Sequence, residues 1–343
     1  MSTRTANNMS KVKIGIAFGS GVARGWAHIG VLRGLTKAGY APDIISGTSI
    51  GALVGGSYAA GKLSQLEQFA LSFHGRKLIN LLDLRLGGAG LIGGKHLARA
   101  MEEHLGDVQI EHLGRTFIAV ATELSTGHET WLRQGSIVEA IRASYALPGL
   151  FEPVSHEGRW LIDGALVNPV PVSPCRAMGA RLVIAVNLNA DALGTANIFD
   201  GHTVETMSGE PVSSKTRPDE TADDETHKHS WWARTKNRVS PSERTIARHF
   251  LGTKKNAPGL TSVMSGALNI MQDRLSRSRL AADPADVIIT PHVGHISLIE
   301  FDKAEELISL GEAAANHALP FIEEAMKRLN GGVETPALQP VAM

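Results

Sequence analysis

The sequence has one cysteine, few aromatic residues and no long apolar run. Its single thiol, Cys175, excludes an internal disulfide and is typical of a reducing compartment. Residues 1–13 are polar and contain no apolar core of a secretory signal. No apolar run approaches the length of a membrane span. We therefore expect a cytoplasmic protein, at most peripheral at the inner face of a membrane.

The chain also has no net charge and no residue spacing typical of a metal site. The chain has 34 basic and 34 acidic residues, which predicts no bulk attraction to nucleic acid. The cysteine and the histidines show no zinc-ligand spacing. Two segments imitate nucleotide loops, but 56–62 lacks the hydroxyl that binds magnesium and 88–93 lies outside the first βα unit. We expect neither metal nor cofactor.

Glycine is plentiful, and it follows the first strands of the chain. Residues 12–18 are mostly apolar and predict a central strand, the glycine-rich stretch 19–25 follows, and 26–38 has helical periodicity. A second strand at 44–45 leads into another glycine turn and a small-residue helix at 52–60. Two parallel βα units bring both loops to the same carboxyl edge of a sheet, where α/β proteins build sites.

The second turn has the form of a nucleophile elbow. Gly47-Thr48-Ser49-Ile50-Gly51 fits Gly-x-Ser-x-Gly between a strand and a helix. Gly47 and Gly51 leave room for the sharp turn, which lifts the Ser49 hydroxyl clear of the backbone. The motif is short, and an ordinary glycine-rich βα turn is the competing interpretation.

The first glycine loop suits an oxyanion hole. Its glycines can turn several backbone N–H groups toward one point beside the elbow serine. The predicted donors are the backbone N–H groups of Ser20, Gly21 and Val22, with that of Ile50 after the nucleophile.

A serine nucleophile needs a base, and the sequence offers two kinds. Asp163 precedes Gly164 at the end of a predicted strand, 159–162, although the tripeptide alone somewhat favours an Asx-turn. His292 or His295 would complete the order Ser…Asp…His of an α/β-hydrolase. The early position of Ser49, after only the second strand, argues against the histidine.

The rest of the chain predicts one α/β domain over 11–330 with flexible tails at 1–10 and 331–343. A helix with Ser136 as N-cap and Glu139 in the capping-box position is expected at 136–144. Further strands are expected at 117–122, 129–132 (antiparallel to the former), 181–186 and 285–290. Further helices are expected at 63–73, 95–105, near 172–178, at 261–280 and at 304–329, the last broken or kinked near Pro320.

Residues 192–258 change character. They are polar and charged, with few aliphatic side chains, and predict a mobile insertion. Trp231 and Trp232 lie there among cations, which suits a membrane interface; a lid segment or a packing anchor is an equal alternative.

These motifs, in this order, resemble the patatin-like phospholipases, in their bacterial branch related to neuropathy target esterase. The resemblance rests on the loop from Gly19 to Arg24-Gly25, the elbow 47–51 and Asp163-Gly164-Ala165, with further likeness at 143–151 and 168–171. It spans about 12–190 and resumes weakly over about 260–325.

The resemblance implies a three-layer α/β/α sandwich with a mainly parallel central sheet. It also implies a Ser–Asp dyad without histidine, with Ser49 as nucleophile and Asp163 as base. Arg24 would then hold the glycine loop or meet a lipid phosphate. Ser20 and Val22 depart from the branch, which usually has glycine there, but a backbone donor survives a change of side chain.

The implied function is a lipid acyl hydrolase of the phospholipase A or lysophospholipase type. Its substrate would be a phospholipid or lysophospholipid, cleaved at a carboxylic ester through an acyl-enzyme. Two alternatives stay open: an acyltransferase that uses the same dyad, and a membrane- or partner-binding scaffold with a silent site.

Overall fold

The computed structural model describes residues 12–72, 95–190 and 260–330. The strands are β1 Ile14–Phe18, β2 Ile44–Thr48, β3 Thr116–Glu123, β4 Glu129–Leu132, β5 Val154–His156, β6 Arg159–Asp163, β7 Leu182–Val186 and β8 Val287–Ile289. The α-helices are α1 Ala27–Lys37, α2 Ile50–Ala59, α3 Leu63–Leu71, α5 Lys95–Leu105, α6 Ile137–Ser144, α7 Val172–Ala177, α9 Leu260–Ala282 and α10 Ala304–Asn330. Short 3₁₀ segments lie at Val22–Trp26, Ile110–His112, Gly164–Leu166 and Phe301–Lys303.

Contacts divide the chain into two units. The first combines Met1–Ala196 with Ala267–Met343 and contains all the strands described above. The second is Asn197–Gly266, of which only the start of α9 is described. None of the helices in the described ranges is both long and apolar enough to span a bilayer.

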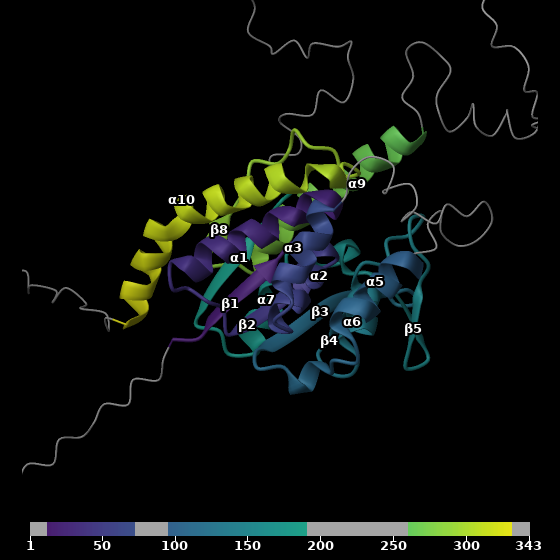
Figure 1. Ribbon diagram of the computed structural model, residues 1–343, viewed down its shortest axis with the longest axis horizontal. Helices are drawn as coiled ribbons and strands as arrows, with labels where there is room; N and C mark the ends of the chain where they lie inside the picture. Colours follow the sequence, from purple (N-terminus) through teal and green to yellow (C-terminus); the bar gives the residue numbers. More distant parts are fainter. Residues whose placement is uncertain (1–11, 73–94, 191–259, 331–343) are drawn as a thin grey trace, which may run out of the picture. The chain divides into compact units, whose positions relative to one another are not determined.

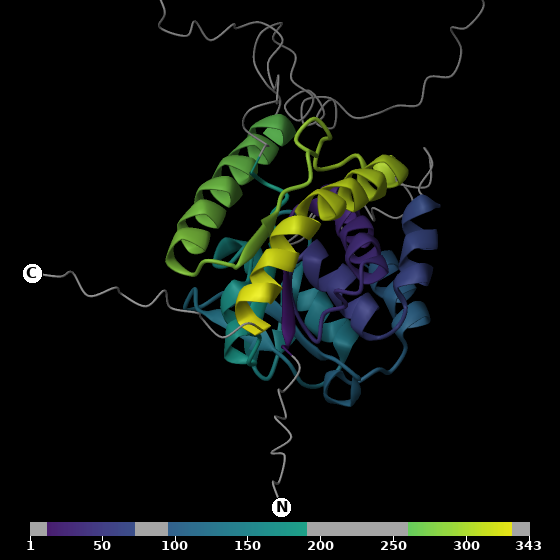
Figure 2. The same ribbon diagram turned by 90° about the vertical axis from the view of Figure 1, so that its left-hand side faces the viewer.

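The first unit is built on a mixed, mainly parallel sheet. Its order is β5-β6-β3-β2-β1-β7-β8, and β4 also pairs with β3. The pairs among β3, β2, β1, β7 and β8 are parallel, whereas β4, β5 and β6 form antiparallel pairs. Helices cover both faces of this sheet (Figures 1 and 2). This is the three-layer α/β/α sandwich that the sequence predicted.

Alternate side chains of the central strands enter two separate cores. Ile14, Ile16 and Phe18 of β1 pack with α1, α2, α6 and α10 on one face. Ala17 of β1 faces the other core, with α7 and the end of α9. Because both faces are buried, these strands are almost continuously apolar.

The last helix crosses the first at very short range. A Cβ placed on Gly30 of α1 would lie 1.8 Å from the Ile308 carbonyl oxygen, and one on Gly311 of α10 would lie 1.9 Å from that of Ala27. Figure 1 shows α10 running beside α1 above the sheet. The end of the chain therefore closes over its first βα unit.

Most predicted elements are confirmed within a few residues, including the antiparallel pairing of β4 with β3 and the Ser136 cap, whose hydroxyl accepts from the Glu139 N–H. The sequence predicts a break or a kink near Pro320: the helix is not broken, since α10 is one helix that contains this proline, and its ribbon bends along its length (Figure 2). A helix tolerates proline when the missing bond is absorbed by such a bend. The predicted tails 1–10 and 331–343 and the insertion 192–258 lie outside the described residues.

Candidate functional site

Two strand ends meet along β3 and bring the predicted dyad together. Thr48, the last residue of β2, pairs with Val120, and Asp163, the last residue of β6, pairs with the adjacent Ala121. Since β2 and β6 run in opposite directions, they end facing each other. Ser49 follows Thr48 directly, so the sheet register itself places Ser49 beside Asp163.

Ser49 occupies the sharp turn between β2 and α2. Its φ is 59° and its ψ is −122°, a conformation that L-residues rarely adopt. The turn has no room for side chains on either side: a Cβ on Gly47 would lie 2.4 Å from the Gly51 carbonyl oxygen, and one on Gly51 would lie 2.3 Å from that of Phe18. A side chain at either position would therefore collide with backbone.

The hydroxyl of Ser49 donates a hydrogen bond to the Asp163 carboxylate. The distance from Ser49 Oγ to Asp163 Oδ2 is 2.7 Å, and the other carboxylate oxygen, Oδ1, accepts from the Ala165 N–H at 2.8 Å. Burial raises the pKa of Asp163 to about 7, and these two hydrogen bonds oppose the rise. A carboxylate with this pKa is a better proton acceptor near neutral pH than an exposed one.

Hydroxyl groups that sequence reasoning missed hold both members of the pair. The Ser49 N–H donates to Ser144 Oγ at 2.9 Å, and that hydroxyl donates to the Val120 carbonyl at 2.6 Å. Thr122 Oγ1 donates to the Asp163 carbonyl at 2.8 Å. After Asp163, a Cβ on Gly164 would lie 2.2 Å from the Val120 carbonyl oxygen, so the backbone at Gly164 packs directly on β3. Both side chains are thus fixed through their backbones.

The glycine loop is anchored by a buried histidine. His28 Nε2 lies 2.7 Å from the Gly19 carbonyl oxygen, and because a carbonyl only accepts, this nitrogen carries the proton. Burial lowers the pKa of His28 to about 4, so the ring is neutral at physiological pH.

The structure narrows the set of oxyanion donors that the sequence predicted. The Ser20 N–H donates to the Pro169 carbonyl at 2.9 Å, so this N–H is already used and Ser20 leaves the set. Its hydroxyl donates to Gln272 Oε1 at 3.2 Å. Among the described residues, the backbone N–H groups of Gly21, Val22 and Ile50 have no acceptor.

Arg24 is buried and holds the loop to the far end of the chain. Its Nε donates to the Ile296 carbonyl at 2.6 Å, and its Nη2 to the Gly294 carbonyl at 3.2 Å. Of the two roles considered for this residue, the contacts favour the structural one. Beside it, a Cβ on Gly25 would lie 2.1 Å from the Ile50 side chain, so the glycine loop packs directly on the first turn of α2.

An apolar cavity opens beside Ser49. It is lined by Val22, Ser49, Ile50, Leu53, Tyr145, Leu147, Leu150, Phe151 and Phe301. None of these side chains is a carboxylate, an ammonium or a guanidinium. Burial raises the pKa of Tyr145, and its ring packs edge-on against Phe151 with centroids 5.0 Å apart. The cavity suits a hydrocarbon chain better than a charged group.

The two histidines predicted as alternative bases, His292 and His295, are both exposed. His295 Nε2 lies 3.1 Å from Glu306 Oε1, so the partner of this ring is a surface carboxylate and not Ser49 or Asp163. Trp231 and Trp232 lie outside the described residues. In the described ranges, no group of three or more His, Cys, Asp or Glu side chains is placed to bind a metal ion.

The sequence matches a known class of proteins. Residues 16–176 match the sequence model of the patatin-like phospholipases. This match contains the glycine loop, the elbow serine and Asp163.

Relatives of similar length narrow the class. NTE family proteins of Mycobacterium tuberculosis and Mycobacterium bovis are each 33% identical over 335 residues, which cover 92% of this chain and 93% of theirs. The chain therefore belongs to the NTE family of patatin-like phospholipases. Lysophospholipase nte1 of Emericella nidulans is 30% identical over 202 residues, 54% of this chain but only 12% of that one.

A solved structure, VipD from Legionella pneumophila, is also similar. The superposed region covers 92% of this chain and 67% of VipD, with a TM-score of 0.44 and a sequence identity of 13%. Both values are too low to bear on function.

Proposed function

We propose that this protein is a lipid acyl hydrolase that cleaves carboxylic esters of phospholipids or lysophospholipids with a Ser49–Asp163 dyad. The observation that carries the proposal is the 2.7 Å hydrogen bond from the Ser49 hydroxyl to a buried carboxylate. Family membership and the similarity to nte1, a lysophospholipase, support the choice of substrate class.

In the proposed first step, Asp163 accepts the hydroxyl proton as Ser49 Oγ attacks the ester carbonyl carbon. The carbonyl π electrons move to oxygen, and the N–H groups of Gly21, Val22 and Ile50 stabilise that oxyanion. When the tetrahedral intermediate collapses, the alcohol leaves with the proton from Asp163 and an acyl-serine remains.

In the second step, Asp163 accepts a proton from water, which attacks the acyl-serine. The fatty acid leaves, and the proton returns to Ser49. Ser144 and His28 do not touch the reacting atoms in this scheme; they hold the elbow and the glycine loop.

The test uses the purified full chain with lysophosphatidylcholine and a fluorophosphonate probe. Wild type is expected to release fatty acid and to be labelled at Ser49. Ser49→Ala and Asp163→Asn are expected to lower kcat/KM by about 10⁴-fold or more. Ser64→Ala, which removes an exposed serine of α3, is the control and should match wild type.

Two results would contradict the proposal. Hydrolysis that survives both dyad variants would refute the dyad. A folded wild-type protein that neither reacts with the probe nor cleaves any ester would favour the silent scaffold instead.

A further inference from the structure

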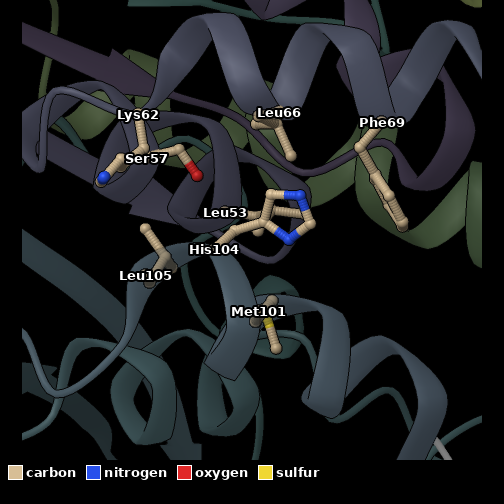
Figure 3. A pocket seen from close by; sticks show the side chains of 8 residues that line it. All are labelled: Leu53, Ser57, Lys62, Leu66, Phe69, Met101, His104 and Leu105. Carbon is tan, nitrogen blue, oxygen red and sulfur yellow. The ribbon is translucent and has the colours of Figure 1, made fainter.

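A second apolar cavity is also lined by Leu53. Figure 3 shows it between α3 and α5, with Leu66 and Phe69 entering from α3 and Met101 and His104 from α5. Leu53 lines this cavity and also the cavity beside Ser49. Leu53 is the one residue that the two linings share.

The α2 helix connects the cavities in a straight row. Ser49, Leu53 and Ser57 are spaced by four residues, so they follow one another along the same face of the helix. With a rise of 1.5 Å per residue, the row extends about 12 Å from Ser49 to Ser57. A chain attached at Ser49 that follows this face passes Leu53 and then reaches the second cavity.

The side chains of the second cavity suit hydrocarbon. Leu66, Met101 and Leu105 are buried and belong to the same apolar core as Leu53. Its polar groups come from Ser57, Lys62 and His104. The His104 ring lies between Leu66 and Met101 in Figure 3 and packs against the Phe69 ring, with centroids 6.1 Å apart.

Neither cavity alone has room for a long acyl chain. Their volumes are about 50 Å³ for the cavity beside Ser49 and about 20 Å³ for the second, space for only a few water molecules. A long chain must therefore displace side chains. Leu53 lines both cavities, and Met101, an unbranched and adaptable side chain, lines the second one.

We propose that the second cavity receives the distal part of a long acyl chain, and that Leu53 sets the chain length that the site accepts. This rests on the proposed function, since it extends the acyl site of the Ser49–Asp163 dyad. Rotation of Leu53 joins the two cavities into one apolar channel along α2.

The first test compares kcat/KM for nitrophenyl palmitate and nitrophenyl butyrate. Leu53→Ala is expected to raise the palmitate-to-butyrate ratio by about tenfold, and Met101→Trp, which fills the second cavity, to lower it by about tenfold. Val54→Ala is the matched control, because Val54 is the buried neighbour of Leu53 on α2 and lines neither cavity. Opposite shifts in two variants cannot both come from a damaged fold. An unchanged ratio in both would overturn the proposal.

The second test does not depend on hydrolysis. A palmitate analogue with a photoreactive diazirine at its methyl end is bound to Ser49→Ala, irradiated and mapped by peptide mass spectrometry. Cross-links are expected on α3 and α5, at or near Leu66 and Met101, and fewer in Met101→Trp. Cross-links confined to other elements would refute the second cavity. Cross-links on α3 and α5 with no ester cleaved by wild type would leave the cavity assigned and refute the hydrolase.

Discussion

Val22 and Ser49 line one cavity from left-handed backbone conformations, with φ of 50° and 59°. For a β-branched residue such as Val22 this conformation is an outlier, because Cβ approaches the following carbonyl. Backbone strain is therefore concentrated on both sides of the proposed reaction centre. The surrounding fold has to hold both residues in these strained conformations.

Replacing Val22 with glycine is expected to stabilise the protein. The change removes about 1–2 kcal/mol of dihedral strain, while glycine adds an unfolded-state entropy cost of about 0.5–1 kcal/mol. We expect the free energy of unfolding in urea to rise by about 0.5–1 kcal/mol. Glu157→Gly is the matched control for the relief of strain alone. Glu157 has φ 48° but lies in an exposed turn and does not line the cavity. A loss of stability in Val22→Gly alone would show that Val22 side-chain packing outweighs the strain.

Ser144→Ala is expected to impair both stability and turnover. It leaves the buried Ser49 N–H unpaired, at a cost of about 1–3 kcal/mol in the free energy of unfolding. Because the elbow then shifts, we expect kcat to fall by about 10²-fold with a smaller change in KM. Ser276→Ala serves as the control: this serine is also fully buried, but its hydroxyl has no partner in the described part of the chain. Equal effects of the two variants would exclude a positioning role for Ser144.

Asp163→Asn is expected to change how stability depends on pH. The folded pKa, about 7, lies above the ordinary value of 3.8, so the contribution of Asp163 is fully favourable below pH 3.8 and is lost as pH rises to about 7. Each pH unit in that window costs about 1.4 kcal/mol. Near pH 3.8 the Tm of the variant should therefore equal that of wild type. As the pH rises toward 7, the Tm of the variant should exceed that of wild type by a growing margin. A difference in Tm independent of pH would show that Asp163 is ionised at little cost.

The reaction of Ser49 is expected to speed up with pH through the pKa of its partner. If Asp163 is the base, the second-order rate of fluorophosphonate labelling should rise with a midpoint near its pKa of about 7 and then level off. Dividing by the rate of probe hydrolysis without protein corrects for the reagent. His295→Ala should leave the midpoint unchanged; a displaced midpoint would return the base role to a histidine.

Sequence reasoning succeeded where the physical requirement is local. The Gly47 and Gly51 pattern predicts the elbow because the turn itself has no space for a side chain. The apolar runs of β1 and β7 predict central strands because both faces of these strands are buried. Each of these constraints involves only a few neighbouring residues.

Sequence reasoning was weaker where the requirement joins distant segments. Nothing around residue 20 indicates that its N–H donates to the Pro169 carbonyl, so the sequence predicts Ser20 among the oxyanion donors. Ser144 lies in a segment with family likeness, but only the structure connects its hydroxyl to the Ser49 N–H. The two roles of Leu53 likewise require the packing of α3 and α5 against α2. A single sequence contains no direct signal for these contacts.

The hold of Arg24 on the end of the chain has a consequence for biosynthesis. Its guanidinium bonds to Asn269, Gly294 and Ile296, all of which leave the ribosome more than two hundred residues later. A nascent chain that ends before residue 260 already contains Ser49 and Asp163 but lacks these three anchors and the α10 crossing over α1. The loop that is translated early therefore gains these contacts only after residues 269–296 have been translated.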